Sequence, residues 1–225
     1  MTRVPGHRYA VFFLIAGASL CWDLYSKSVV FRDLGYPGGG VAVLEPGEHR
    51  IFASPEYAGR RSAEDGAVEG VSVPYIDGWM TFRLFTSFNH GALWGVGQGY
   101  SWAFAVMSVL AAAGILYWLF VRKAATSAWL TVALAFVLGG TLGNLFDRTG
   151  LHGCIDPATG ETIHAVRDFL LFTFGSFSWP VFNFADVYLV TGAIMLVLQS
   201  FRPEAAAKTA AEAGDEAAGG RAASA

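Results

Sequence analysis

The 225-residue sequence has little charge and little cysteine. Asp, Glu, Lys and Arg make up 15% of the residues, whereas about a quarter is usual in a soluble domain. The formal net charge of -3 is small, so nothing in the composition indicates a nucleic-acid partner. Of the two cysteines, Cys21 lies in an apolar segment and Cys154 in a polar one, and we expect both thiols to be unpaired. The HEXXH and CXXC spacings are absent, and we expect neither a metal nor a cofactor.

Long apolar runs take the place of the missing charge. Hydrophobic residues make up 54% of the chain, which indicates a mainly α, polytopic membrane protein rather than a large soluble core. The first apolar segment is long enough to span, and its polar residues suit a retained helix better than a cleaved signal peptide. The sequence predicts four transmembrane helices, at about 9–30, 102–121, 128–146 and 181–201.

The segments between these runs are polar. We expect a single membrane domain over residues 1–202, with polar loops at 31–99 and 147–180. Residues 82–96 alternate aromatic and polar side chains, which is typical of a strand or extended segment. Residues 203–225 are mostly Ala, Glu, Gly and Lys without apolar periodicity, and we expect a disordered cytoplasmic tail.

Basic residues at the segment ends predict the topology. Arg3 and Arg8 precede the first span, Arg122 and Lys123 follow the second, and Arg202 follows the fourth. Because cytoplasmic flanks are enriched in Lys and Arg, both termini should be cytoplasmic. The polar residues of the first, third and fourth spans then gather at the outer side.

Two acidic residues are the strongest functional candidates. Asp168 follows the polar run after the third span, and Asp186 lies near the start of the fourth. A carboxylate in or beside a span is costly and is a functional candidate by default. Two carboxyl groups that share one proton form the acid–base device of aspartic proteases. On residues alone, each aspartate is equally well explained as a buried polar group that ties helices together.

The same polar residues fit two other classes of function. Intramembrane carboxylates also build proton relays, so a small proton-coupled transporter is an alternative. Against it, the charges cluster at one face and none marks a path to the other side. The third alternative is a catalytically inert scaffold that binds lipopeptides.

Further polar residues fall at helical or turn spacing. Asp23 and Lys27 are four apart and can pair on one helix face, although they also fit an interfacial anchor. Asn89 carries donor and acceptor groups, and Gly91 permits close approach of another chain, although Asn-His-Gly is also an ordinary turn. We expect His90, His152 and His164 to be surface or loop histidines.

The third and fourth spans carry the remaining polar groups. Gly140, Asn144 and Arg148 share one face of the third span, next to Asp147. Glycines 139 and 140 are explained by tight helix packing, which accounts less well for the polar residues. Asn183 lies three residues before Asp186, on the same face.

In combination, these motifs resemble lipoprotein signal peptidase (signal peptidase II). The matching segments occur in the order typical of that family, from the first span to the fourth: Asp23-x3-Lys27, Asn89-His-Gly-Ala, Gly139-Gly-x2-Gly-Asn-x2-Asp-Arg148, Val166-Arg-Asp168-Phe and Phe182-Asn-Phe-Ala-Asp186. Each motif is modest by itself, but five in order are specific.

The resemblance implies an aspartic peptidase with Asp168 and Asp186 as its catalytic pair. It implies that surrounding residues shape the site or bind substrate: Asp23, Lys27, Asn89, Gly91, Asn144, Asp147, Arg148 and Asn183. The implied substrate is a diacylglyceryl-modified prolipoprotein, cut before the lipidated cysteine in the bacterial cytoplasmic membrane without a metal. The implied partners are this substrate and membrane lipids. The site needs one chain, so a monomer is expected. The first polar loop would form a small extracytoplasmic β-cradle with a short amphipathic helix.

The chain departs from the family pattern in two places. The stretch between Arg148 and Asp168 is long, with CIDPATGETIH as the predicted insertion, and the first polar loop is expanded. The insertion brings in Asp156 as a rival for the catalytic role. We prefer Asp168 because Phe169 and the hydrophobic run after it can dock this segment at the membrane.

Overall fold

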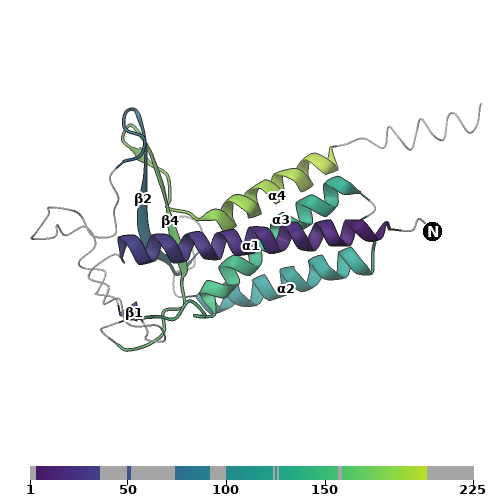
Figure 1. Cartoon of the computed structure of the whole chain (residues 1–225), viewed down its shortest axis with the longest axis horizontal. Helices are drawn as coiled ribbons and strands as arrows, with labels where there is room; N and C mark the ends of the chain where they lie inside the picture. Colours follow the sequence, from purple (N-terminus) through teal and green to yellow (C-terminus); the bar gives the residue numbers. More distant parts are fainter. Residues whose placement is uncertain are drawn as a thin grey trace, which may run out of the picture.

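The computed structural model describes residues 4–35, 50–51, 74–91, 100–123, 125, 127–156 and 159–201. Four helices lie beside one another, and a small sheet projects from one end of the bundle (Figure 1). The order of elements is α1 (Gly6–Leu34), β1 (Arg50–Ile51), β2 (Met80–Asn89), α2 (Ser101–Phe120), α3 (Ala128–Arg148), β3 (Cys154–Ile155), β4 (Val166–Phe174), β5 (Phe177–Ser178) and α4 (Phe184–Ser200). The prediction of a mainly helical protein is confirmed.

Three of the described helices, α1, α2 and α3, are long and apolar enough to cross a membrane. α4 is also apolar but has 17 residues. It begins at Phe184 rather than at 181, because Asn183 occupies the N-cap position. α3 extends beyond the predicted end at 146 to Arg148, and its last turn is held by contacts with the sheet.

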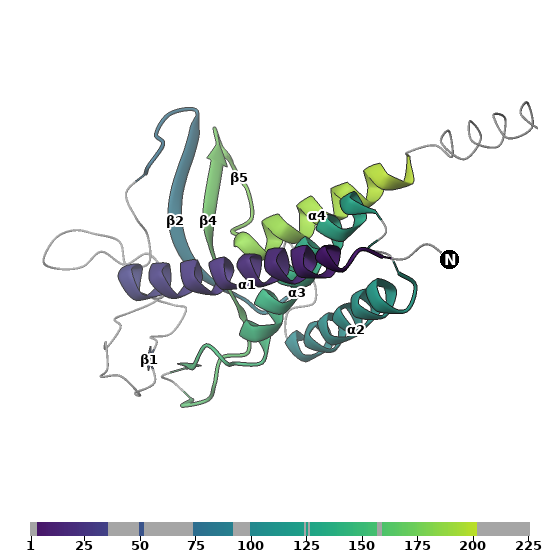
Figure 2. The same cartoon turned by 45° about the vertical axis from the view of Figure 1, so that its right-hand side comes forward.

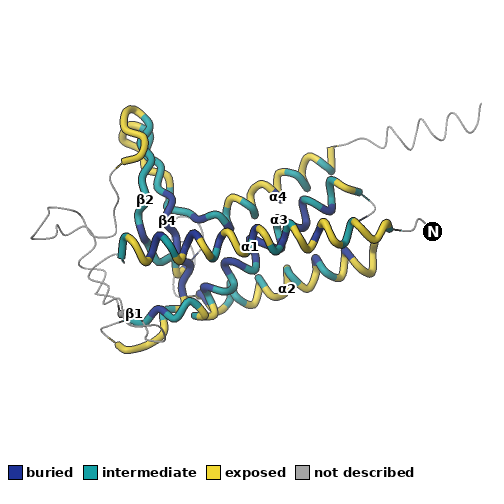
Figure 3. Tube along the Cα trace, in the orientation of Figure 1, coloured by how far each residue is buried: buried dark blue, intermediate teal, exposed yellow. Residues whose placement is uncertain are grey.

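α3 is the central helix of the bundle. In its most apolar stretch 56% of residues are buried, compared with 11% in α2, and Figure 3 shows this difference as dark and light tubes. Thr131, Thr141 and Asn144 are buried on α3. The outer face of α2 carries exposed Val106, Val109 and Leu110 instead, which suits contact with lipid.

Glycines allow the close packing around α3. A Cβ on Gly139 would lie 2.7 Å from Ser19 Cβ of α1, and one on Gly140 would meet the carbonyl oxygen of Ala185 on α4. Any larger side chain would therefore push α1 or α4 away from α3. The prediction that this glycine pair permits tight packing is confirmed.

The helices alternate in direction. The N-terminal end of α1 and the C-terminal end of α4 both lie at the end of the bundle away from the sheet (Figures 1 and 2). The end of α1, the end of α3 and the start of α4 therefore meet near the base of the sheet. These are the segments that carry Lys27, Asp147 and Asp186.

The sheet has the strand order β2–β4–β5, and all of its neighbours are antiparallel. Ser87 is opposite Asp168, and the register shifts between Leu84 and Ser87. The prediction of extended structure at the start of 82–96 is confirmed by β2. The 147–180 region, expected as a polar loop, differs, since it contains β3, β4 and β5. Its run from Val166 to Phe174 pairs with β2 and does not lie free.

A short parallel pair, β1 with β3, joins the first polar region to the second. No disulfide joins Cys21 to Cys154, as expected. The predicted amphipathic helix, the expanded part of the first loop and the C-terminal tail lie outside the described residues.

Candidate active site

Asp168 and Asp186 reach the site from different elements. Asp168 lies in β4, and strand alternation directs its side chain away from that of its neighbour Arg167. Asp186 is the third residue of α4. The Asn183 side chain accepts a hydrogen bond from the Asp186 N–H, and the Asp186 carboxylate accepts one from the Asn183 N–H. This capping box satisfies free N–H groups at the helix start and fixes the orientation of Asp186.

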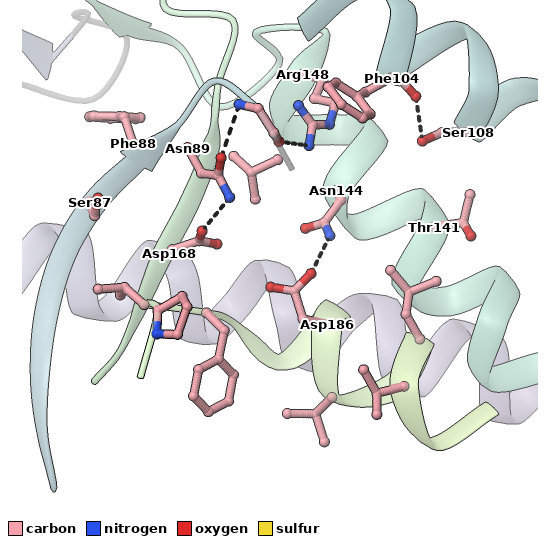
Figure 4. Close-up of a pocket in the computed structure, with 18 of the residues that line it drawn as sticks. Ser87, Phe88, Asn89, Phe104, Ser108, Thr141, Asn144, Arg148, Asp168 and Asp186 are labelled. Atoms are coloured by element: carbon pink, nitrogen blue, oxygen red, sulfur yellow. Dashed lines mark hydrogen bonds between the residues drawn. The ribbon is translucent and has the colours of Figure 1, made fainter. Parts of the chain in front are cut away.

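Asparagine side chains contact both carboxyl groups, and Figure 4 shows two of these contacts, Asn89 with Asp168 and Asn144 with Asp186. Asp168 accepts a hydrogen bond of 2.6 Å from Asn183 Nδ2 and one of 3.0 Å from Asn89 Nδ2. Asp186 accepts one of 2.9 Å from Asn144 Nδ2. Asn183 Nδ2 also donates to Asn144 Oδ1, at 3.2 Å. The two carboxyl groups therefore share one network of amides.

The two aspartates differ in exposure. Asp168 is 2% exposed, whereas Asp186 is only partly buried. Burial raises the pKa of Asp168 well above its ordinary value, and the charge of Asp186 raises this pKa further. Hydrogen bonds from Asn89 and Asn183 act in the opposite direction but are smaller causes. Asp168 therefore ionises less readily than an ordinary aspartate.

Both carboxyl groups open into one pocket of about 900 Å³. Its wall is made by β2, α2, α3, the segment before α4 and α4 itself. Among its apolar lining residues are Phe104, Met107, Val166, Trp179, Val181, Phe182 and Leu189. An apolar pocket with a few polar groups at one place suits a ligand that is largely hydrocarbon.

Arg148 also lines the pocket, near Asn89 (Figure 4). Its Nη2 donates to the Gly91 carbonyl at 2.8 Å, and its guanidinium lies 4.8 Å from the centre of the Phe104 ring. Gly91 N–H donates to Asn89 Oδ1 at 3.0 Å. Arg148 thereby holds the segment after β2, and this segment holds the asparagine that contacts Asp168.

A buried ionic cluster lies next to the pocket. Lys27 Nζ is 2.7 Å from Asp23 Oδ2 and 3.2 Å from Asp147 Oδ2, and all three side chains are fully buried. Arg167 adds a second cation, 2.9 Å from Asp147 Oδ1. Asp23 accepts the Ala185 N–H at 2.8 Å, and Lys27 donates to Asn144 Oδ1 at 3.1 Å. We name Asp23, Lys27, Asp147 and Arg167 the ionic cluster. It joins α1, α3, β4 and the start of α4.

The structure divides the residues singled out from the sequence into two groups. Six line the pocket: Asn89, Gly91, Asn144, Arg148, Asp168 and Asp186. Asp23, Lys27, Asp147 and Asn183 lie behind it, where they hold the lining residues. The predicted pairing of Asp23 with Lys27 is confirmed, and their full burial does not fit an exposed interfacial anchor.

Asp156, the alternative catalytic candidate, lies outside the pocket that Asp168 and Asp186 line. Asp156 lies in the turn after β3, where its backbone pairs with Glu161, and it is not among the residues that line the pocket. His90 and His164 are exposed, as expected, but His152 is partly buried. Burial lowers the pKa of His152 to about 4.

Three residues at the site were not predicted from the sequence. Arg167 belongs to the ionic cluster, and its only signal was its place beside Asp168. Phe104 and Trp179 line the pocket, and nothing distinguished them from other aromatics of a membrane protein. Within the described ranges, no group of three His, Cys, Asp or Glu side chains is arranged to hold a metal ion.

Apolar helices that end at a pocket lined by two carboxyl groups define the class as a membrane protein with a polar site at one end of its helices. The family model described as signal peptidase (SPase) II matches residues 57–202. The chain belongs to the signal peptidase II family, as the motif resemblance predicted.

Relatives of known name support this membership. A lipoprotein signal peptidase of Rhodopirellula baltica is 39% identical over 199 residues, which is 88% of this chain and 74% of that protein. One of Geobacillus thermodenitrificans is 33% identical over 197 residues, covering 87% of this chain and 92% of that protein. A bacterial membrane enzyme solved in meso at 2.3 Å has a TM-score of 0.57 at 18% identity, over 87% of this chain and 90% of its own. The transporter and scaffold alternatives are not favoured by these relatives.

Proposed function

We propose that this protein is an aspartic endopeptidase of the bacterial cytoplasmic membrane. It removes signal peptides from diacylglyceryl-modified prolipoproteins by cutting before the lipidated cysteine. Asp168 and Asp186 are its catalytic pair. The observation that carries the proposal is the amide network that links these two carboxyl groups at one pocket.

The pair suits hydrolysis by an activated water. With one proton between them, the ionised carboxyl group acts as general base on a water molecule. The protonated one polarises the scissile carbonyl and then protonates the leaving amine. The proton belongs to the pair, so either residue takes either role as the reaction proceeds.

The surroundings support a lipidated peptide as substrate. The apolar wall between α2 and α4 suits acyl chains, and the polar end near Asn89 and Arg148 suits a peptide backbone. Gly91 lines this polar end, and without a side chain it would let the extended peptide approach its backbone. Membrane lipids contact the outer faces of the helices. The protein acts as a monomer, because one chain supplies all residues of the proposed site.

The proposed topology has four spans. α4 is the fourth, and its 17 residues suffice where the adjoining sheet lies at the membrane surface. Both termini are cytoplasmic, in agreement with the basic flanks. The β2–β4–β5 sheet and the carboxyl pair are then on the extracytoplasmic side, where a lipidated prolipoprotein is exposed.

The test is cleavage of a lipidated prolipoprotein by the purified protein in detergent or liposomes. Asp168→Asn and Asp186→Asn should each lower turnover by roughly 10²- to 10⁴-fold or more, since each removes a proton-transfer group. Asp156→Asn is the matched control and should keep the unaltered rate. Retained turnover in either variant would remove that residue from the pair, and proton flux without cleavage would favour a transporter.

A further inference from the structure

The family resemblance implies a role for Asp23, Lys27 and Asp147 of the ionic cluster but none for Arg167. It is 4% exposed although it carries a full charge. Three hydrogen bonds join it to Asp147: its N–H to Oδ2 at 2.9 Å, its Nε to Oδ1 at 3.1 Å and its Nη2 to Oδ1 at 2.9 Å. Charged hydrogen bonds of this kind are short and strongly directional.

These bonds fix the strand that carries Asp168. Arg167 and Asp168 are successive residues of β4, so their side chains point to opposite faces. The face of Arg167 is tied to α3, and the face of Asp168 meets Asn89 and Asn183. A movement of β4 at Arg167 therefore moves the Asp168 carboxyl group directly.

The same stretch of α3 holds the other carboxyl group. Asn144, three residues before Asp147, donates to Asp186. The last turn of α3 thus fixes both members of the pair, Asp186 through an amide and Asp168 through the Arg167–Asp147 link. The spacing of the two carboxyl groups depends on both connections.

Arg167 also balances the charge beside the pair. The ionic cluster contains two cations and two carboxylates, which are neutral together. Without Arg167, the cluster carries a net negative charge in a buried region. The charged groups that act on Asp168 are Lys27 from α1, Arg148 from α3 and Asp186 from α4. Behind Lys27 lie Asp23, Asp147 and Arg167 of the ionic cluster, and His90, after β2, lies near Arg148.

We propose that Arg167 is a positioning residue for the carboxyl pair: it locks β4 onto α3 through Asp147 and keeps the ionic cluster neutral beside Asp168. The proposal rests on the function proposed above. It assigns to Arg167 no contact with substrate and no part in proton transfer.

The test compares Arg167→Gln with Arg32→Gln. The control removes the arginine of an exposed Arg–Asp pair, in which Arg32 Nε lies 2.7 Å from Asp33 Oδ1. Arg167→Gln should lower kcat by about 10- to 100-fold with KM within about twofold, because misplaced reacting groups slow the chemical step. The pH profile of kcat should move to higher pH, because unbalanced negative charge favours protonated carboxyl groups. Arg32→Gln should leave both unchanged.

Arg167→Lys separates geometry from charge and replaces Arg167→Gln if the latter does not fold. Lysine keeps the cation but not the two guanidinium bonds, so kcat should fall while the pH profile stays in place. Unaltered kcat in Arg167→Lys, or a kcat and pH profile of Arg167→Gln like those of Arg32→Gln, would overturn the proposal.

A titration of ¹³C-labelled aspartate carboxyl groups, followed by NMR, measures the same charge effect without any turnover. The Asp168 signal, assigned with Asp168→Asn, should titrate at higher pH in Arg167→Gln. If the unaltered protein does not cleave prolipoprotein, the proposed function fails, and this titration still decides the role of Arg167. An unmoved titration would refute the charge part of the proposal.

Discussion

Asp147 and Asp168 are both buried carboxyl groups near the end of the bundle, but their partners differ in kind. Asp147 is surrounded by cations, with Lys27 at 3.2 Å and Arg167 at 2.9 Å. Asp168 is held by the neutral amides of Asn89 and Asn183. A carboxylate between two cations stays ionised and ties elements together. One held by amides beside a second carboxyl group can gain and lose a proton.

The ionic cluster holds the helices and the sheet together, whereas the amide network of Asn89, Asn144 and Asn183 holds the proposed catalytic pair. Asn144 connects the two, because its side chain accepts a hydrogen bond from Lys27 and donates one to Asp186. Changes at Lys27 or Asp23 should therefore act mainly on stability, and changes in the amide network mainly on turnover, whereas Arg167 connects the cluster to the strand that carries Asp168.

Lys27→Met should have the largest effect on stability. It leaves Asp23 without its cation and Asp147 with Arg167 alone, and an uncompensated buried charge costs about 3–5 kcal/mol. Thermal unfolding of the purified protein in detergent measures the loss. The exposed Arg32→Met variant is the control. A melting temperature as high as that of the unaltered protein would contradict the structural role of the cluster.

Asn89→Ala should act on turnover and leave stability nearly unchanged. It removes the 3.0 Å hydrogen bond to Asp168, and this bond lowers the pKa of Asp168. The pKa of Asp168 should therefore rise in the variant. Because one carboxyl group of the pair must be ionised to act as base, the acid limb of the kcat profile should move to higher pH. We expect a loss of about tenfold in kcat at neutral pH, the equivalent of one hydrogen bond.

The control for Asn89→Ala is Ser87→Ala, which changes another β2 residue that lines the same pocket. Ser87→Ala should keep the position of the acid limb. If both variants shift the limb equally, the effect belongs to the strand and not to the contact with Asp168.

His152→Gln should have the smallest effect, confined to stability below neutral pH. Burial lowers the pKa of His152 to about 4, so the folded protein holds the neutral imidazole. The unfolded chain takes up a proton as the pH falls below about 6.5, and the folded protein does so only near its own lower pKa. The unaltered protein should lose under about 1 kcal/mol between pH 7 and pH 6 for this reason.

His152→Gln should remove that part of the pH dependence, measured as the change in melting temperature between the two pH values. The exposed His7→Gln variant should retain it. Since His152 lies on the side of the ionic cluster, kcat should be the same in both variants. A change in kcat would place His152 in the amide network instead.

The sequence by itself determined the class of this protein. Charge deficit and apolar runs predicted the helices, because an apolar span must satisfy its backbone internally. Ordered motifs predicted the family and ten candidate site residues, six of which line the pocket. Spacing within one helix also predicted the Asp23–Lys27 pair, because residues four apart are neighbours on a helix.

Only the tertiary structure decided which of these residues line the pocket and which lie behind it. Arg167 has no helical or motif partner in sequence, and its contact with Asp147 spans 20 positions. Asp168 belongs to a strand instead of a loop because β2 supplies its partner residues from a distant segment. Which carboxyl group meets cations and which meets amides depends on these long-range contacts, since the sequence pattern fixes only the neighbours along one element.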